Sequence, residues 1–232
     1  MVEQNNISII YLFMEDPTSF EEQCVKDVYN YIAHDFDKSR YSVWNCVEKF
    51  LESLLKQDIS CRVADVGCGN GKNMMMSPRN FIGIDACESF VKICMGKGLN
   101  AIIGSILQLP LKTNSVDHSI CIAVIHHLST MERRQLAIKE LLRITKPGGK
   151  ILVLVWNDET INHKKCRLVR EGNYQDVMVS WKGTLDEEMW RYYHLFLKNE
   201  LDDLILSVDS NVSILETFEE KGNYGVIFSK TK

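Results

Sequence analysis

The sequence lacks the cysteine spacing that metal sites and redox-active pairs use. Its 232 residues include eight cysteines, yet no two of them form a C-x-x-C pair. Several stand inside apolar runs, as Cys121 does between Ile120 and Ile122. A free cysteine in such a run packs like a small hydrophobic residue, and its thiol stays reduced in a reducing compartment. We therefore expect reduced, buried thiols and no metal site.

A long hydrophobic run and an excess of positive charge are absent as well. The apolar stretch ISIIYLFM at residues 7–14 is too short to cross a bilayer, and Glu3 precedes it where a signal peptide would carry cations. We interpret this stretch as a strand or a docking segment with no membrane role. The formal charge of −4 argues against a general coat for nucleic acid but leaves room for a local basic face.

Hydrophobic periodicity predicts one α/β domain. The first helix should begin at a capping box, Ser19-Phe20-Glu21-Glu22, and end near Phe36. A later helix should turn Leu136, Leu141 and Leu142 inward. The expected helices cover residues 19–36, 43–55, 87–96, 129–144 and 201–206, and the expected strands cover 62–66, 81–84, 101–103, 116–124, 151–156, 213–218 and 224–228.

Strands that alternate with helices indicate a doubly wound, mostly parallel sheet. The last two strands form an antiparallel hairpin across Lys221-Gly222-Asn223, which gives seven strands in a Rossmann-like sheet. We divide the chain into an N-terminal helical segment, a cofactor-binding core, a substrate cap and a C-terminal helix with hairpin, at residues 1–58, 61–156, 157–197 and 198–232. Residues 157–191 show few periodic signals, so we expect a partly irregular cap.

The glycine turn after the first strand points to a nucleotide-like ligand. Gly67, Gly69 and Gly71 follow a G-x-G-x-G spacing, and Asp65 precedes them. A dinucleotide site prefers G-x-G-x-x-G. Glycines at such a turn let backbone approach a ligand closely. Asp85 ends the next strand, where a carboxylate can bind ribose hydroxyls.

Together with GSILQLPLKTNSVD and ITKPGGKILVLVW, these motifs resemble the class I S-adenosylmethionine-dependent methyltransferases over roughly residues 62–156. The resemblance implies that the glycine turn holds the methionine part of the cofactor, that Asp85 binds the ribose and that Ser105 and Ile106 flank the adenine. Many relatives have an aspartate where Ser105 stands. The implied cofactor residues are Asp65, Gly67, Gly69, Gly71, Lys72, Asp85, Ala86, Ser105, Ile106 and Ala123.

Further segments narrow the resemblance. IAVIHHLSTMERRQLAI, SRYSVWNC, QDVMVSW and RYYHLF together resemble the eukaryotic tRNA methyltransferases that esterify 5-carboxymethyluridine at the wobble position. The likeness covers most of residues 24–228. It departs in the cap, because only nine residues separate Trp181 from Arg191, where relatives often carry a long polar insertion. The resemblance implies a cytoplasmic location, with the nucleus as a second one.

The chemistry of such a reaction calls for residues that hold the substrate carboxylate, and not for a base that removes a proton. An alkyl carboxylic acid is already an anion at neutral pH, so the site must align and desolvate it. Arg40 is the first candidate for an arginine clamp. One of His126 and His127 should face the pocket, and we assign His126. The other catalytic candidates are Arg191, Tyr193 and His194, which could stack on a base or bind phosphate or carboxylate, and Asp176, which could fix the uracil edge, orient Arg40 or simply form a turn.

A basic loop and an unguarded strand suggest partners. Residues 163–170 hold four cations and no acid, which suits the backbone of an anticodon stem: Lys164, Lys165, Arg167 and Arg170. The family implies a small zinc-binding activator protein, and the uncharged strand at Asn100–Ile106 is a possible edge for it. A small-molecule O- or C-methyltransferase and a non-catalytic scaffold that binds RNA or protein remain the alternatives.

Overall fold

The computed structural model describes residues 15–159, 165–184 and 187–231. The expected strand or docking segment at residues 7–14 therefore lies outside the described residues. Within the described part of the chain, no helix is long and apolar enough to cross a membrane.

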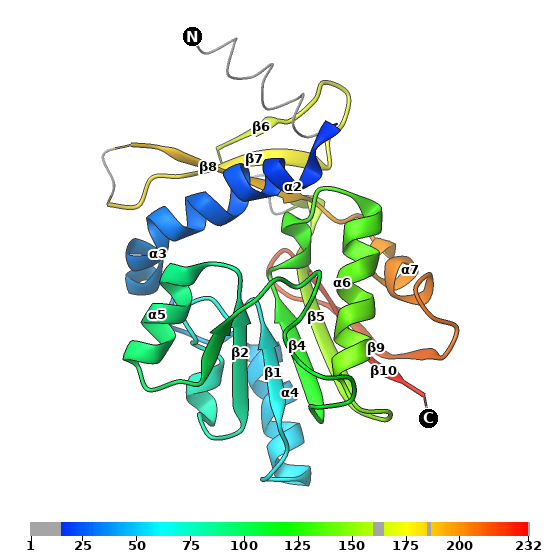
Figure 1. Ribbon diagram of the computed structural model, residues 1–232. Coiled ribbons are helices and arrows are strands. Elements are labelled where there is room, and N and C mark those ends of the chain that lie inside the picture. The colour runs from blue at the N-terminus through cyan, green and yellow to red at the C-terminus, as the bar shows by residue number, and fades with distance from the viewer. Residues whose placement is uncertain (1–14, 160–164, 185–186, 232) are drawn as a thin grey trace.

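A seven-stranded sheet forms the core, with the strand order β3-β2-β1-β4-β5-β10-β9 (Figure 1). The first five strands in this order are parallel, and β10 pairs antiparallel with both β5 and β9. This arrangement confirms the predicted fold class. The strands are β1 (Val63–Val66), β2 (Phe81–Asp85), β3 (Ala101–Ile103), β4 (His118–Ile122), β5 (Lys150–Trp156), β9 (Val212–Glu219) and β10 (Asn223–Lys230).

Helices cover both faces of this sheet. On one face pack α4 (Asn45–Gln57) and α5 (Glu88–Gly96), and on the other α6 (Met131–Ile144) and α7 (Glu200–Leu206). Side chains of β5 alternate between the two layers: Leu152 and Leu154 face α4, whereas Val153 faces α6. Short 3₁₀ turns stand at Met74–Met76 and Ile125–His127.

Two local predictions about helices are wrong. Leu136 is 42% exposed, because it lies about 200° round α6 from the buried Ile138. The first helix begins at Pro17, where the Asp16 carboxylate accepts a hydrogen bond from the Ser19 N–H at 3.1 Å. It continues through α2 (Pro17–Glu21), a π-helical turn (Glu22–Lys26) and α3 (Asp27–Ser39), and so passes Phe36.

A second sheet corrects the expectation of an irregular cap. Its three antiparallel strands are β6 (Cys166–Leu168), β7 (Asp176–Trp181) and β8 (Met189–His194). Both faces of β7 are buried: Met178 packs with Phe20 of α2, and Val177 packs with Tyr193 and Trp156. A strand covered on both faces reads as a nearly continuous apolar run, which explains why no alternation appears in the sequence.

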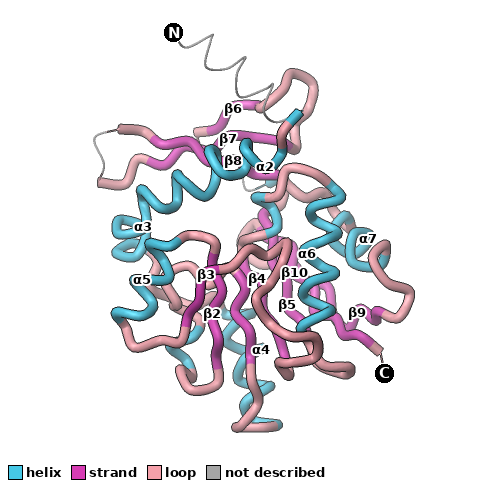
Figure 2. Tube along the Cα trace, in the orientation of Figure 1, coloured by secondary structure: helices cyan, strands magenta, loops and turns pink. Residues whose placement is uncertain are grey.

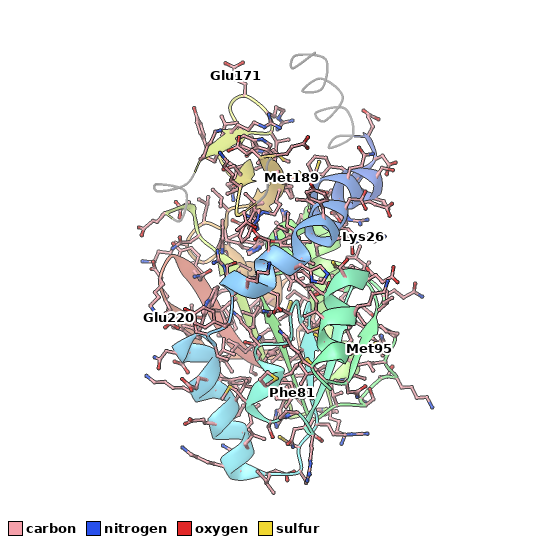
Figure 3. The ribbon with its side chains drawn as sticks, turned by 90° about the vertical axis from the view of Figure 1, so that its left-hand side faces the viewer. Lys26, Phe81, Met95, Glu171, Met189 and Glu220 are labelled. Atoms are coloured by element: carbon pink, nitrogen blue, oxygen red, sulfur yellow. The ribbon has the colours of Figure 1, made fainter. Side chains whose placement is uncertain are left out.

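The small sheet and the N-terminal helices close one end of the large sheet. Figure 2, in which all strands are magenta and all helices cyan, shows α3 between the small sheet and the large one, and α3 packs against both α5 and β8. In Figure 3, Met189 of the small sheet lies at the opposite end of the molecule from Phe81, the first residue of β2. The carboxyl ends of the parallel strands therefore face the small sheet, and the space between them is where open α/β sheets bind ligands.

Candidate active site

A cavity of about 570 Å³ lies at the carboxyl ends of β1, β2 and β4. The N-terminal helices and β8 enclose it from the other side. The structure brings together at this cavity twelve residues predicted from the sequence: Arg40, Gly67, Gly69, Lys72, Asp85, Ala86, Ser105, Ile106, Ala123, His126, Arg191 and Tyr193. Asp65, Gly71, Asp176 and His194 do not line it.

The glycine turn leaves room for a ligand. Gly67 and Gly69 have φ angles of +74° and +53°, which side chains rarely adopt. A Cβ on Gly67 would lie 2.2 Å from Cγ2 of Val124, so only glycine fits beside that strand end. A Cβ on Gly69 would meet nothing within 4 Å. Gly69 therefore borders open space that a cofactor can enter.

Asp85 is fixed by the same turn. Its carboxylate accepts the N–H of Gly69 at 2.8 Å and the N–H of Cys87 at 2.8 Å, one on each oxygen. Burial raises the pKa of Asp85 to about 6. The carboxylate lines the cavity with lone pairs to spare, so it can accept hydrogen bonds from ribose hydroxyls.

Asp65 sits behind the turn as a buried acceptor. Burial raises its pKa to about 7, and its Oδ1 has no hydrogen-bond partner among the described residues. Asn73 lines the cavity, and its Nδ2 donates to Oδ2 of Asp65 at 3.4 Å. The Oδ1 of Asn73 also lacks a donor within the described chain. Two buried acceptors without donors fit a cationic ammonium group, such as the one in the methionine part of S-adenosylmethionine.

Two arginines that line the cavity converge on the ring of Trp181. The guanidinium carbon of Arg40 lies 5.4 Å from the Trp181 ring centroid and that of Arg191 lies 5.1 Å from it. Arg40 is exposed, whereas Arg191 is 5% exposed and also contacts the rings of Tyr29 and Tyr193. The described residues include no carboxylate paired with Arg191, and its buried Nε has no acceptor among them.

Asn70 connects this end of the cavity to the glycine turn. Its side-chain amide donates to the backbone oxygen of Arg40 at 2.8 Å and to the Asp37 carboxylate at 2.9 Å. Asp37 in turn pairs with Lys97 at 2.6 Å. The residue between two of the glycines therefore holds the end of α3 from which Arg40 projects.

Tyr29 is a functional residue that sequence reasoning missed, because it reads as one more apolar position of an amphipathic helix. Burial lowers the pKa of His127 to about 3, so the ring is neutral, and its Nδ1 donates to the Tyr192 carbonyl at 2.7 Å. Its Nε2 must then accept the Tyr29 hydroxyl at 3.1 Å. The Tyr29 oxygen is left to accept from Arg191 at 3.0 Å and from the Tyr193 hydroxyl at 3.1 Å.

We expected one of His126 and His127 to face the cavity and the other to pack elsewhere, but the structure does not separate them in this way. Both are buried and both line the cavity. The Nδ1 of His126 accepts the backbone N–H of Trp156 at 3.0 Å, and its ring packs 4.9 Å from that of Tyr193. Trp156 stacks on Tyr193 with centroids 4.2 Å apart. These rings form an aromatic wall of the cavity, and Arg191 contacts it at Tyr193.

Asp176 and His194 serve a buried ionic network instead of the cavity. The His194 ring bonds Asp176 through Nδ1 at 2.9 Å and Glu200 of α7 through Nε2 at 2.7 Å. Burial opposes a charge on His194, but these two carboxylates outweigh it and raise its pKa. Asp176 also accepts the Tyr192 hydroxyl. The network ties the small sheet to the helical layer of the core, so Asp176 does not orient Arg40 as one of the expectations had it.

Removing the central histidine should destabilise the fold without altering ligand binding. We expect His194→Ala to lower the free energy of unfolding by about 3 kcal/mol, because the buried Asp176 and the partly buried Glu200 lose their cation. Urea denaturation measures the change. The matched control, His34→Ala at an exposed position of α3, should stay within about 0.5 kcal/mol of the parent. Equal stability of the two variants would refute the structural role.

The basic loop at residues 163–170 is less available for binding RNA than its sequence suggests. Lys164 lies outside the described residues. Lys165 forms an ion pair with Glu188 at 2.6 Å, and Arg167 lies 4.3 Å over the ring of Trp190. Figure 3 shows the adjoining turn at Glu171 at the outer tip of the small sheet, far from the large one. Among the described cations of this loop, Arg170 alone is exposed without being engaged in such a contact.

Comparisons with known proteins agree with this geometry. A family model described as a methyltransferase domain matches residues 64–153. The chain is 37% identical over 231 residues to the tRNA (carboxymethyluridine(34)-5-O)-methyltransferase of Schizosaccharomyces pombe, and the match covers 91% of this chain and 98% of the relative.

Solved structures show the fold. An amino pentose methyltransferase of Micromonospora echinaspora with bound S-adenosylmethionine has a TM-score of 0.62 at 16% identity, and the match covers 87% of this chain and 96% of that one. A methyltransferase in complex with the Haloferax volcanii Trm112 activator has a TM-score of 0.62 at 15% identity, covering 90% and 98%. By its sequence and its domain, the chain belongs to the tRNA (carboxymethyluridine(34)-5-O)-methyltransferase family of class I S-adenosylmethionine-dependent methyltransferases.

Proposed function

We propose that the protein transfers the methyl group of S-adenosylmethionine to the carboxylate of 5-carboxymethyluridine at the wobble position of tRNA. The product is the methyl ester, 5-methoxycarbonylmethyluridine. The observation that carries the proposal is Arg191, a buried guanidinium with no carboxylate partner in the described structure, beside Arg40 in an aromatic-walled cavity. A buried cation without a counter-ion is costly and fits an anionic substrate.

The cofactor end of the cavity fits S-adenosylmethionine part by part. The Asp85 carboxylate would accept the ribose hydroxyls. Asn73 would border the methionine ammonium, and the buried Asp65 carboxylate behind it would supply negative charge. Ser105 and Ile106 would border the adenine. The Ser105 hydroxyl already accepts the Leu107 N–H at 3.2 Å, so it keeps one lone pair for a direct or water-mediated contact. When bound, the cofactor supplies an electrophilic methyl group.

The residues at the substrate end would bind and orient the carboxylate, without removing a proton. A carboxylic acid of ordinary pKa near 4 is ionised at neutral pH. Attack by a carboxylate on a sulfonium methyl destroys both charges, so a dry cavity favours the step. The arginines hold the anion before that charge is lost. They should therefore act chiefly through substrate binding and alignment.

Tyr193 would contribute a directed acceptor. Its proton is committed to the Tyr29 oxygen, so towards the cavity its hydroxyl oxygen offers lone pairs. A pyrimidine ring placed between Tyr193 and the arginines would meet an acceptor suited to the uracil N3–H. This polarity follows from the neutral His127 at the far end of the chain of hydrogen bonds.

The exposed edge of the large sheet supports the proposal that an activator protein binds this chain. β3 is the outermost strand beside β2, and Ile103 on it is 56% exposed. Ile103, Gly104 and Ser105 also border the cofactor cavity. A partner strand added at this edge would cover apolar surface and would brace the adenine end of the site.

Co-expression tests this partner. We expect the chain produced with a Trm112-type zinc-binding activator to be more soluble and to bind S-adenosylmethionine more tightly than the chain alone. Ile103→Lys should weaken the complex, because it places a charge on the paired edge. The matched change Leu136→Lys, at an exposed site on α6, should not. A chain that alone is soluble, monomeric and fully active would contradict the proposal.

Methyl transfer distinguishes the proposed function from its alternatives. Labelled S-adenosylmethionine is offered with tRNA bearing 5-carboxymethyluridine, with the same tRNA unmodified, and with small carboxylic acids, each with and without the activator. The proposal expects label only in the modified tRNA. Transfer to small acids alone would make the protein a small-molecule methyltransferase, and cofactor binding without any transfer would favour a scaffold.

A further inference from the structure

A second hollow adjoins the catalytic cavity. Its volume is about 410 Å³, and it lies between the C-terminal end of α3 and residues 180–184 at the end of β7. Arg40 and Arg191 line both hollows. Trp181, whose ring lies close to both guanidinium groups, lines the second hollow but not the first. The two hollows therefore meet at the arginines, and we call the second one the groove.

The groove is cationic. Lys38, Arg40, Lys182 and Arg191 line it, and among the described lining residues Asp35 is the one carboxylate. Asp35 already accepts the backbone N–H of Thr184 at 3.0 Å and the Thr184 hydroxyl. Both lysines are exposed, and neither forms an ion pair with any residue that the structure describes. In a chain of net charge −4, such a local excess of cations marks an anion-binding surface.

We propose that this groove binds the phosphodiester backbone of the RNA nucleotides that flank the wobble uridine. The inference rests on the proposed function and names how its substrate is held. A modified base can reach an enclosed cavity only if it is turned out of the stack, while its sugar and phosphates stay outside. A cationic groove that shares two arginines with the cavity is placed to receive those phosphates.

The groove suits this task better than the loop at residues 165–170. The loop's Lys165 is neutralised by Glu188 and its Arg167 covers Trp190. The loop turn also projects from the outer tip of the small sheet, whereas the groove touches the cavity itself. We therefore assign the phosphate contacts nearest the reacting base to Lys38 and Lys182.

Equilibrium binding of an anticodon stem-loop RNA at several salt concentrations tests the assignment without requiring methyl transfer. The double variant Lys38→Ala/Lys182→Ala should weaken binding about tenfold or more near physiological salt. The slope of log Kd against log salt should fall by about 0.7 for each phosphate that the variant no longer neutralises. Lys139→Ala, an exposed lysine of α6, and Arg170→Ala in the loop should each leave affinity within about twofold. Affinity for S-adenosylmethionine should be unchanged in all three variants.

Failure of the groove and failure of the proposed function give different results. An unchanged slope in the double variant, or an effect confined to Arg170→Ala, would overturn the groove, as would a parent protein that binds no RNA. Groove-dependent RNA binding with no ester formed would leave the groove standing and overturn the proposed function.

Discussion

Arg191→Met should lower kcat/KM for methylation of the carboxymethyluridine tRNA roughly a thousandfold. The reason is the loss of a buried charge partner, which costs about 3–5 kcal/mol. Each tenfold change corresponds to about 1.36 kcal/mol. Most of the loss should appear in KM, because the substrate anion is fully charged in the ground state and partly neutral in the transition state. Steady-state kinetics at saturating cofactor measures both constants.

Two controls separate binding of the anion from simple misfolding. Arg191→Lys keeps the charge but loses the planar fork, so it should fall between the parent and the methionine variant. Arg62→Met, at an exposed position just before β1, should have little effect. The parent should bind the substrate tRNA more tightly than the methyl-ester product, and Arg191→Met should lose that preference. A methionine variant that still discriminates between acid and ester would refute the clamp.

Asp85→Ala should weaken binding of S-adenosylmethionine by more than about a hundredfold. The carboxylate would make two charge-assisted hydrogen bonds to ribose, each contributing about 1.5–3 kcal/mol. Its removal also leaves the N–H groups of Gly69 and Cys87 without their acceptor, which loosens the turn. Isothermal titration with the cofactor measures the effect. Glu171→Ala at the outer tip of the small sheet should bind as the parent does, and equal affinity of the two variants would contradict this role.

The raised pKa of Asp85 gives the same prediction a pH dependence. Its folded value of about 6 lies above the ordinary value near 4, so the protonated group stabilises the ligand-free protein. That contribution is complete below about pH 4 and is lost as the pH rises through about 6. Cofactor binding needs the ionised form, so affinity should weaken as the pH falls below about 6. Asp85→Asn should lose the part of this dependence near pH 6, while the buried Asp65, whose pKa is raised to about 7, still titrates. A pH profile identical to the parent's would contradict the role of Asp85.

The cofactor half of the site could be predicted because its signals are local. The glycine spacing at Gly67–Gly71 and an acid at the end of the second strand lie within a few residues of the atoms they position. The parallel sheet follows from the alternation of helices and strands. The cavity forms where these locally determined segments meet, so the sequence is enough to place it.

The substrate half could be predicted only in part, because tertiary packing decides it. Arg40 and Arg191 become neighbours through Trp181, which stands on a different strand from Arg191. Tyr29 carries no local sign that its hydroxyl joins His127 to Arg191. His194 stands in the same motif as Arg191 but points into an ionic network, since nearby positions of a strand face opposite sides or different neighbours.

The most direct test of the proposed reaction identifies the atom that receives the methyl group. After transfer from labelled S-adenosylmethionine, the wobble nucleoside is isolated and treated with mild alkali. We predict label in 5-methoxycarbonylmethyluridine and its complete release as methanol, with the acid recovered. Label that resists alkali, or that resides on ribose or on a ring atom, would contradict the claim that a carboxylate held by Arg40 and Arg191 is the acceptor.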